Sequence, residues 1–576
     1  MKKIYKLFIA LMAFVMIITL SSCLSSPVND DELNLVEKSV TFTNLSKDYE
    51  VGDSEVKLYF YENGNVPLIN VSSYYGMLEG YYENSKRTVS TNTYFNRLYI
   101  TDKDYSYRRV IFDWRYNTVT FKNTVNVYST YSHGSIDFNA YYDLAIAKGL
   151  TSLDIEYYFG NYDIDILFYK GNVLMPVSAI NFMNGDYYNV IYNGVKLYGF
   201  YYGDNTDSVY SEATMTGEIP EDIKTETKNE LLFLLNEKYG LKDYSNVSDY
   251  KDVLGEELLN QFMGNSDQRD DAYLKIIHTL LNDPHSRMQK LSFYHDSTKS
   301  ISTADYEGEN SRYNKIRDVF TDLRGKYSES EVFKNPDTNN LTLFKDSDGA
   351  QSYIYYKGNT MFISFQNFLM GNKDQVYKDE GGYKDTAYIY STAALFYKAL
   401  TDAKDNHPNV KNVVVDVSIN GGGYVAACYK ILSFISDNIY FGYSIDKNNT
   451  EVYKIMGDTN MDGKYSGNES FSNFNYYVLE SEGTFSAANA FACFSKYSGS
   501  VKTIGKRSGG GMCAVMPYVL TDGTRFNLSD KSAQMAVQSL EREFVVYSIE
   551  GGAPVDIPLE YEDFYNFEKI VELINQ

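Results

Sequence analysis

The segment from Val413 to Gly423 limits the fold of this chain more than any other feature. It reads VVVDVSINGGG, so a β-branched apolar run leads directly into three glycines. Such a continuous run is typical of a strand that is covered on both faces. The glycines let backbone N–H groups approach a ligand closely, which an ordinary turn does not require. We therefore expect a buried strand that ends at a functional loop.

The neighbouring segments predict the layers around this strand. Residues 353–356 and 361–365 are strand-like, whereas residues 393–403 and 426–435 are helix-like. Alternation of strands and helices is typical of an α/β fold. We therefore predict an α/β core from residue 351 to residue 576.

A serine follows a second β-favouring run. Residues 476–479 read YYVL, and residues 487–494 are small and helix-tolerant, so Ser486 falls at a strand-to-helix junction. Backbone N–H groups at a helix start lack intrahelical partners and can stabilise the negative charge that develops during acyl transfer. This position suits a serine nucleophile. A helix cap is the alternative, because serine favours that position without any catalytic role.

A histidine follows a helix-like apolar segment upstream. His285 stands next to an Asp-Pro turn, and the chain has only five histidines. An imidazole can act as a general base near neutral pH. A structural histidine is the alternative reading.

Taken in order, these three segments resemble the C-terminal processing (tail-specific) and tricorn-type serine peptidases over about residues 220 to 576. The family pattern Asp-x-Arg-x-Asn-x-Gly-Gly is matched by Asp416, Asn420, Gly422 and Gly423, with Ser418 in place of the arginine. The nucleophile motif is matched by residues 486–489, with Asn489 in place of the usual acid. Two later family elements correspond to residues 504–510 and 550–556.

The resemblance implies a catalytic scheme. The processing branch uses a lysine base, but that position is Gly511 here, and only Lys502 and Lys506 are nearby. The tricorn branch pairs the serine with an upstream histidine and a late glutamate. By that resemblance, the proposed machinery is Ser486 as nucleophile, His285 as general base, Glu550 as third member, and an oxyanion hole from Gly422 or Gly421 with the N–H of Ala487. It also implies a crotonase-like (ClpP-like) core.

The first 23 residues predict the location of the protein. Three lysines precede an apolar run from Leu7 to Leu20, and Cys23 follows two serines, which is typical of a lipoprotein signal peptide. By resemblance to bacterial lipoproteins, Cys23 carries lipid and residues 24–34 form a tether. We therefore expect an extracytoplasmic protein that is lipid-anchored to a bacterial membrane. An uncleaved signal anchor is the alternative.

Length and charge limit the partners. A chain of 576 residues predicts two or three domains, and 53 basic against 76 acidic residues give a net charge of −23. This charge excludes nucleic acid as an expected partner. The expected partners are a peptide or unfolded protein substrate and, through Cys23, the membrane. The number of subunits is left open.

The remaining chain divides into three predicted parts. Residues 35–215 alternate apolar and polar positions and predict a β-rich domain, in which residues 58–68 and 166–176 indicate an internal duplication. Residues 216–290 predict a small helical cap. Residues 291–350 predict a polar connector without a clear PDZ domain. The fold is thus expected to be multidomain.

Residues 458–469 fit a calcium loop of the EF-hand type. Its proposed ligand positions are Asp458, Asn460, Asp462, Lys464, Ser466 and Glu469. A turn without metal is the alternative, because Asp, Asn and Gly form turns unaided. Catalysis is expected to need no cofactor, so any calcium would be structural.

The leading prediction is a serine endopeptidase that works through an acyl-enzyme. Its main alternative is a catalytically inactive, peptide-binding lipoprotein of the same fold, which the departures at Ser418 and Asn489 keep open. An esterase or amidase that acts on cell-wall material would need the same serine. A cysteine nucleophile is a further alternative, from Cys428, Cys493 or Cys513.

Overall fold

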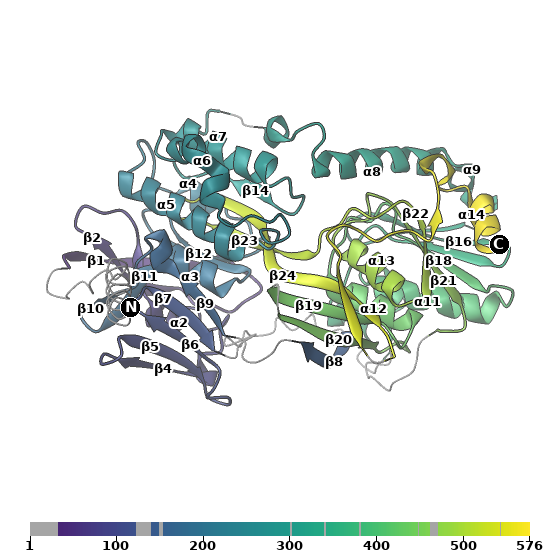
Figure 1. The fold of residues 1–576 in the computed structure, drawn as a ribbon, viewed down its shortest axis with the longest axis horizontal. Coiled ribbons are helices and arrows are strands. Elements are labelled where there is room, and N and C mark those ends of the chain that lie inside the picture. Colours follow the sequence, from purple (N-terminus) through teal and green to yellow (C-terminus); the bar gives the residue numbers. More distant parts are fainter. Residues whose placement is uncertain are drawn as a thin grey trace, which may run out of the picture.

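The computed structural model describes residues 33–122, 140–148, 154–299, 302–338, 341–378, 382–446, 449–460, 471–541 and 543–576. Within these residues it contains three seven-stranded sheets and one five-stranded sheet. Figure 1 shows the N-terminal sheets at one end of the molecule and the C-terminal α/β part at the other. The chain is therefore multidomain, with a β-rich N-terminal region as expected.

Two sheets make up this N-terminal region. The seven-stranded sheet has the order β10-β11-β3-β2-β1-β13-β12. Its strands are β1 (Leu35–Asn44), β2 (Ser54–Tyr61), β3 (Leu68–Asn70), β10 (Leu167–Tyr169), β11 (Asn172–Pro176), β12 (Tyr188–Tyr192) and β13 (Leu197–Tyr201). The five-stranded sheet consists of β4 (Arg87–Asn92), β5 (Arg97–Asp102), β6 (Arg109–Asp113), β7 (Thr118–Lys122) and β9 (Ile155–Tyr158). The helices here are α2 (Val71–Met77), α3 (Val177–Asn184) and α4 (Asp207–Ser211).

The two similar sequence segments of this region lie side by side. Strand β3 runs into α2, and β11 runs into α3. The two strands pair antiparallel, with Pro176 opposite Leu68 and Leu174 opposite Asn70. Each segment thus contributes an equivalent hairpin to one sheet. The duplication itself stays a prediction.

Helices occupy the region before His285. They are α5 (Glu221–Phe233), α6 (Tyr250–Gln261) and α7 (Ser266–Leu274), and π-helical turns extend α5 and α7 to Lys238 and Leu280. Strand β14 (Arg287–Lys290) follows. His285 therefore lies in the short turn between the end of a helix and β14, as its sequence context predicts.

The stretch that reads as a polar connector contains a long helix. Helix α8 (Arg312–Glu329) has 18 residues, and α9 (Glu331–Lys334) follows it. Ser311 caps α8 by accepting a hydrogen bond from the N–H of Asn314 at 3.1 Å. Val319 and Leu323 are buried against the C-terminal sheet. In Figure 1, α8 runs from the helical region to the C-terminal part.

The C-terminal core is built on a sheet of the order β15-β16-β17-β18-β21-β22-β26. Its strands are β15 (Leu341–Lys345), β16 (Gln351–Lys357), β17 (Thr360–Ser364), β18 (Asn412–Asp416), β21 (Asn475–Glu480), β22 (Val501–Gly505) and β26 (Ile557–Pro558). Strands β17, β18, β21, β22 and β26 are parallel. Its helices are α10 (Lys373–Val376), α11 (Thr392–Asn406), α12 (Val425–Ile435), α13 (Ala487–Tyr497) and α14 (Phe567–Ile574). The expected α/β core is present.

Strand β18 is covered on both faces, which explains its continuous apolar sequence. Val413 and Val415 belong to the core that contains α11, α12 and α13. Val414 points to the opposite core, which contains residues of α8 and α14. Because side chains alternate between the faces of a strand, the central positions of a strand covered on both faces are all apolar, here Val413 to Val415.

A third seven-stranded sheet joins the histidine region to the core. It has the order β14-β24-β19-β20-β8, and β23 and β25 also pair with β24. Its remaining strands are β8 (Ala140–Lys148), β19 (Tyr440–Asp446), β20 (Asn449–Gly457), β23 (Cys513–Val519), β24 (Arg525–Ser539) and β25 (Phe544–Ser548). No helix in the described part of the chain is long and apolar enough to cross a bilayer.

Candidate functional site

Three loops meet at the carboxyl ends of the parallel strands. The strands align so that Asp416, the last residue of β18, lies opposite Leu479 of β21, and Glu480 lies opposite Gly505 of β22. The loops that follow these strands therefore leave the sheet at one edge. Open α/β sheets bind ligands at this edge. Residues 417–423, 481–486 and 506–512 form the loops.

Ser486 has an unusual backbone conformation. It precedes α13 with φ of 57° and ψ of −124°. Positive φ is strained for a residue with a side chain, and such residues cluster at functional sites. Its N–H donates to the carbonyl of Gly510 at 2.9 Å, and its carbonyl accepts from Ala490 at 2.9 Å. Its side chain makes no cap hydrogen bond. The simple helix-cap reading is therefore not supported.

The glycine loop approaches Ser486 closely. A Cβ on Gly422 would lie 2.8 Å from the Cβ of Ser486 and 3.1 Å from the N of Ala487. The N–H of Gly422 donates to Asn420 Oδ1 at 2.8 Å, so it is already engaged. Ala487 is the first residue of α13, and its N–H lacks an intrahelical acceptor. Of the two glycines expected at an oxyanion hole, Gly421 is thus the better partner for Ala487.

Replacing Gly422 with alanine is expected to lower any acyl-transfer activity by about 100-fold or more, because the new Cβ would displace Ser486 and cover the N–H of Ala487. The residue also has φ of +115°. Gly358→Ala is the matched control, since it has φ of +59° but open space around its Cβ position. Steady-state hydrolysis of a peptide would measure both variants. Equal activity in the two variants would contradict this role.

His285 contacts the residue next to the serine. Its ring packs on the ring of Phe485 with centroids 4.6 Å apart. The ring Nδ1 lies 3.4 Å from Ser529 Oγ. The backbone N–H of His285 donates to Asp283 Oδ1 at 3.1 Å. Its Nε2 is buried and has no hydrogen-bond partner within the described part of the chain, so it makes no hydrogen bond to Ser486 Oγ. Catalytic hydrogen bonds are often long before substrate binds. One ring nitrogen is thus held and the other is left for proton transfer.

Charge and burial keep this imidazole neutral. Burial lowers the pKa of His285 most, the nearby Arg312 lowers it further, and Asp283 opposes them. A neutral imidazole is the form that accepts a proton. By contrast, His278 uses both ring nitrogens, through Glu307 at 2.8 Å and the N–H of Met288 at 3.4 Å. His278 therefore has a structural role.

Glu550 lies beside the loop that supports the serine. Its Oε2 accepts from the N–H of Gly511 at 3.2 Å and of Met512 at 2.9 Å. Its Oε1 accepts from Arg312 at 2.6 Å. Glu550 makes no hydrogen bond to His285 in the described part of the chain, so its expected place as third member stays a prediction.

Gly511 leaves no room for the lysine that the processing branch carries. A Cβ there would lie 2.8 Å from the Phe485 ring and 3.0 Å from the N of Ser486. The nearby Lys506 pairs instead with Glu560 at 2.6 Å. This geometry favours a histidine over a lysine as the base.

The two departures from the family pattern have structural roles. Asn489 is fully buried, donates to the carbonyl of Ile549 at 2.9 Å and accepts from Ser508 at 2.8 Å. Ser418 is also buried, and its Oγ lies 3.2 Å from the hydroxyl of Tyr565. Both side chains are satisfied within the core.

Sequence reasoning missed two residues of this site. Ser529 lies on β24 and Arg312 at the start of α8, and both lie outside the segments that carry the predicted motifs. Neither position carries a spacing or motif that marks it. Pairing of β14 with β24 brings Ser529 to His285, because Arg287 lies opposite Asn527.

The cysteines do not offer a nucleophile. Cys428, Cys493 and Cys513 are free and buried in the described structure. Burial raises the pKa of each thiol well above its usual value. A thiol in such surroundings stays protonated and inert. Cysteine catalysis is therefore not supported.

Most of the proposed calcium loop lies outside the described residues. Asp462, Lys464, Ser466 and Glu469 fall in the interval 461–470, which is not described. Asp458 is fully buried, and its charge opposes the fall in the pKa of the buried Lys430, which burial lowers to about 8. Asn460 is exposed. No acidic, histidine or cysteine cluster suited to a metal occurs among the described residues. Calcium binding stays a prediction.

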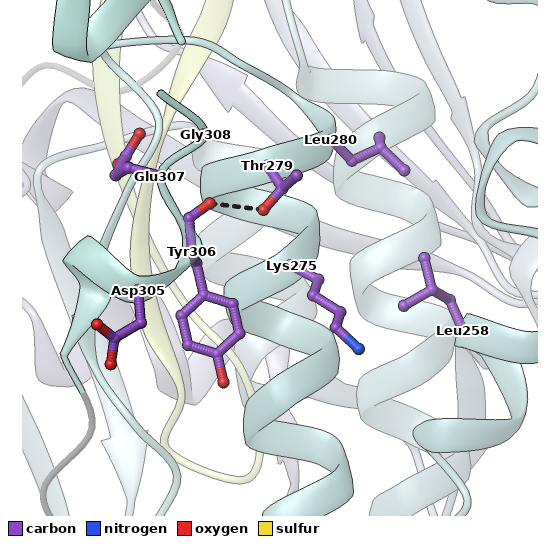
Figure 2. Close-up of a pocket in the computed structure, with 8 residues that line it drawn as sticks. All are labelled: Leu258, Lys275, Thr279, Leu280, Asp305, Tyr306, Glu307 and Gly308. Carbon is purple, nitrogen blue, oxygen red and sulfur yellow. Dashed lines mark hydrogen bonds between the residues drawn. The ribbon is translucent and has the colours of Figure 1, made fainter. Parts of the chain in front are cut away.

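A separate pocket of about 560 Å³ lies between the end of the α7 helix and residues 305–308. Figure 2 shows its lining, which includes none of the predicted site residues. Thr279 Oγ1 donates to the carbonyl of Tyr306 at 2.6 Å, and Lys275 pairs with Asp271 at 2.7 Å. The Thr279–Tyr306 hydrogen bond joins the helix to the segment that leads into α8, whereas the Lys275–Asp271 pair lies within the helix.

Comparisons with known proteins give one family. The model of peptidase family S41 matches residues 375–536, which include the glycine loop and Ser486 but not His285 or Glu550. None of the curated proteins matches this chain.

Solved structures show similarity at low identity. A candidate peptidase from Parabacteroides merdae is 16% identical, with 61% of this chain and 96% of that chain covered and a TM-score of 0.40. The photosystem II D1 C-terminal processing protease is 13% identical, with 58% of this chain and 93% of that chain covered and a TM-score of 0.32. The tricorn protease is 10% identical, with 96% of this chain and 60% of that chain covered and a TM-score of 0.29.

Proposed function

We propose that the chain is a serine endopeptidase of the S41 type that cleaves peptides or unfolded protein segments; the support from the comparisons is the match of the S41 family model to residues 375–536. The observation that carries the proposal is the strained Ser486 between β21 and α13, with His285 packed against its neighbour Phe485. Strain at a strand-to-helix turn is typical of a serine nucleophile.

The proposed reaction proceeds in two acyl-transfer steps. Ser486 Oγ attacks the scissile carbonyl carbon while its proton passes to His285 Nε2. The N–H groups of Ala487 and Gly421 stabilise the negative oxygen. His285 then gives the proton to the leaving amine as the C–N bond breaks. Water, deprotonated by His285, hydrolyses the acyl-enzyme and restores Ser486.

Covalent labelling with a fluorophosphonate tests this proposal. The soluble ectodomain is expected to gain the mass of one adduct, because the reagent phosphonylates an activated serine. Digestion and mass spectrometry should place the adduct on Ser486. Heat-unfolded protein is the control, since it has the same serines without the site. A folded protein that gains no adduct would contradict the proposal.

The alternative is a peptide-binding lipoprotein of the same fold that has lost catalysis. The observation that favours it is the lack of a hydrogen bond between His285 Nε2 and Ser486. Substitution of Ser486 with alanine separates the two functions, because peptide binding should survive this change and hydrolysis should not. An esterase or amidase would differ in substrate profile alone.

We also propose that the protein is lipid-anchored outside the cytoplasm through Cys23. The support is the sequence of residues 1–23, which lie outside the described structure. Mass spectrometry of the N-terminal peptide from membranes would test it. Lipid on Cys23 is expected, and an intact N-terminus at Met1 would contradict the proposal.

A further inference from the structure

We propose that Arg312 is a positioning residue that holds the turn of His285 against the loop of Ser486, and that Glu550 acts on the site through Arg312. This inference rests on the proposed serine–histidine chemistry, which gives the two loops their function. It differs from the expected scheme because Glu550 would not contact the imidazole.

Arg312 first contacts the histidine turn. Its backbone N–H donates to Asn282 Oδ1 at 2.9 Å. Asn282 has φ of +46°, and it begins the turn in which Asp283 accepts from the N–H of His285. The hydroxyl of Ser286 donates to the same Asp283 carboxylate at 2.6 Å. The start of α8 is thus joined to a tightly hydrogen-bonded turn.

The guanidinium of Arg312 contacts the serine side. Its Nη1 donates to Glu550 Oε1 at 2.6 Å, and its Nη2 donates to the carbonyl of Gly509 at 3.1 Å. The next residue, Gly510, accepts the N–H of Ser486. Two donors in a fixed fork can hold a carboxylate and a carbonyl at defined positions, which a lysine cannot do.

Glu550 completes the link. Its side chain is buried, whereas that of Arg312 is 30% exposed. It also accepts the N–H groups of Gly511 and Met512. A buried carboxylate with one cation and two backbone donors is fully satisfied, so it is held in place. Its orientation fixes Arg312, and Arg312 joins the two loops.

The same contacts place charges around His285. Asp283 faces it from its own turn, and Arg312 from α8. Glu550 lies beyond Arg312, while burial raises the pKa of Tyr239 and Cys513 and keeps these groups neutral. Loss of the Arg312 charge should therefore raise the pKa of His285. This shift reports how close the Arg312 charge lies to the imidazole, and the labelling rate reports whether the two loops are held in position.

The test measures the pKa of His285 by NMR of ring-labelled histidine in the full ectodomain. The chain has five histidines, and His285→Gln assigns the signal. Arg312→Gln removes the positive charge and both guanidinium donors, whereas Arg312→Lys keeps the charge but not the paired donors. Arg317→Gln is the control, because Arg317 lies on an exposed face of the same helix and pairs with Asp318. The rate of fluorophosphonate labelling is measured in parallel.

We expect Arg312→Gln to raise the pKa of His285 and to slow labelling by about 100-fold, because a small misplacement of reacting groups has an effect of this size. Arg312→Lys should retain the pKa but label slowly. Glu550→Gln should also slow labelling. The variant that combines Arg312→Gln with Glu550→Gln should label no more slowly than Arg312→Gln alone, because both changes break the same link. Arg317→Gln should have the same His285 pKa and the same labelling rate as wild type.

An unchanged His285 pKa or an unchanged labelling rate in Arg312→Gln would overturn the inference. If that variant does not fold, Arg312→Lys and Glu550→Gln provide the same test, and normal labelling in both would overturn it. If wild type is not labelled while its His285 pKa still follows Arg312, the proposed function fails and the positioning contact stands.

Discussion

Replacing Ser486 with alanine or His285 with glutamine is expected to lower peptide hydrolysis by about 10⁶-fold, and the double variant should be no slower than either single variant. The reason is that the hydroxyl and the imidazole act as one unit: an unassisted serine is a weak nucleophile, and a base without a nucleophile has nothing to activate. Active-site titration and steady-state kinetics measure the effect.

The control for these variants is His407→Gln. His407 is half-buried and stacks on Tyr356 with centroids 3.8 Å apart, and it precedes the amino end of β18, whereas the loop of the site follows the carboxyl end of this strand. Activity in this variant should equal that of wild type. A His285→Gln variant that keeps its activity would contradict the assignment of His285 as the general base and would favour a lysine in that role.

The pH profile of wild type should carry the signature of His285. Its pKa is lowered from 6.5, mainly by burial. Because the base must be neutral, kcat/KM should stay high as the pH falls to 6.5 and should decrease only as the pH passes through the lowered pKa. An acidic limb above pH 6.5 would contradict this environment.

Replacing Arg269 with methionine is expected to lower the free energy of unfolding by about 3–5 kcal/mol, because it leaves the charge of Asp522 buried without its partner. Arg269 Nη2 lies 2.9 Å from Asp522 Oδ2, and the two side chains are 1% and 0% exposed. The pair joins α7 to the turn between β23 and β24. Urea unfolding followed by circular dichroism measures the change.

Lys275→Met is the matched control for this prediction. Lys275 pairs with Asp271 at 2.7 Å in the same helical region, but the two side chains are 45% and 34% exposed. An exposed pair contributes about 0–1 kcal/mol, so this variant should unfold close to wild type. Equal destabilisation in the two variants would contradict the importance of burial.

Much of the C-terminal core could be predicted from its sequence. The run from Val413 to Val417 identified a strand covered on both faces, and the structure places it between two helical layers. The strand-to-helix position of Ser486 is also confirmed. These predictions succeeded because periodicity and helix-start chemistry are local properties of neighbouring residues.

Other predictions concern features that no local pattern reveals. Helix α8 has few apolar positions, and only Val319 and Leu323 among them are buried, against the sheet, so its sequence is typical of a polar connector. Gly422 was one of two glycines expected at the oxyanion hole, but Asn420 accepts its N–H. Competition for one donor depends on side-chain placement, which a motif does not specify.

By itself, the sequence determined which segments become buried strands and where a serine stands at a helix start, because both follow from residue types at short spacing. Tertiary structure alone decided which distant groups meet. It brings Ser529 to His285 through strand pairing and Arg312 to Glu550 across 238 positions. Such contacts depend on how sheets and helices pack in three dimensions, and the energy of each contact is small beside the packing that creates it.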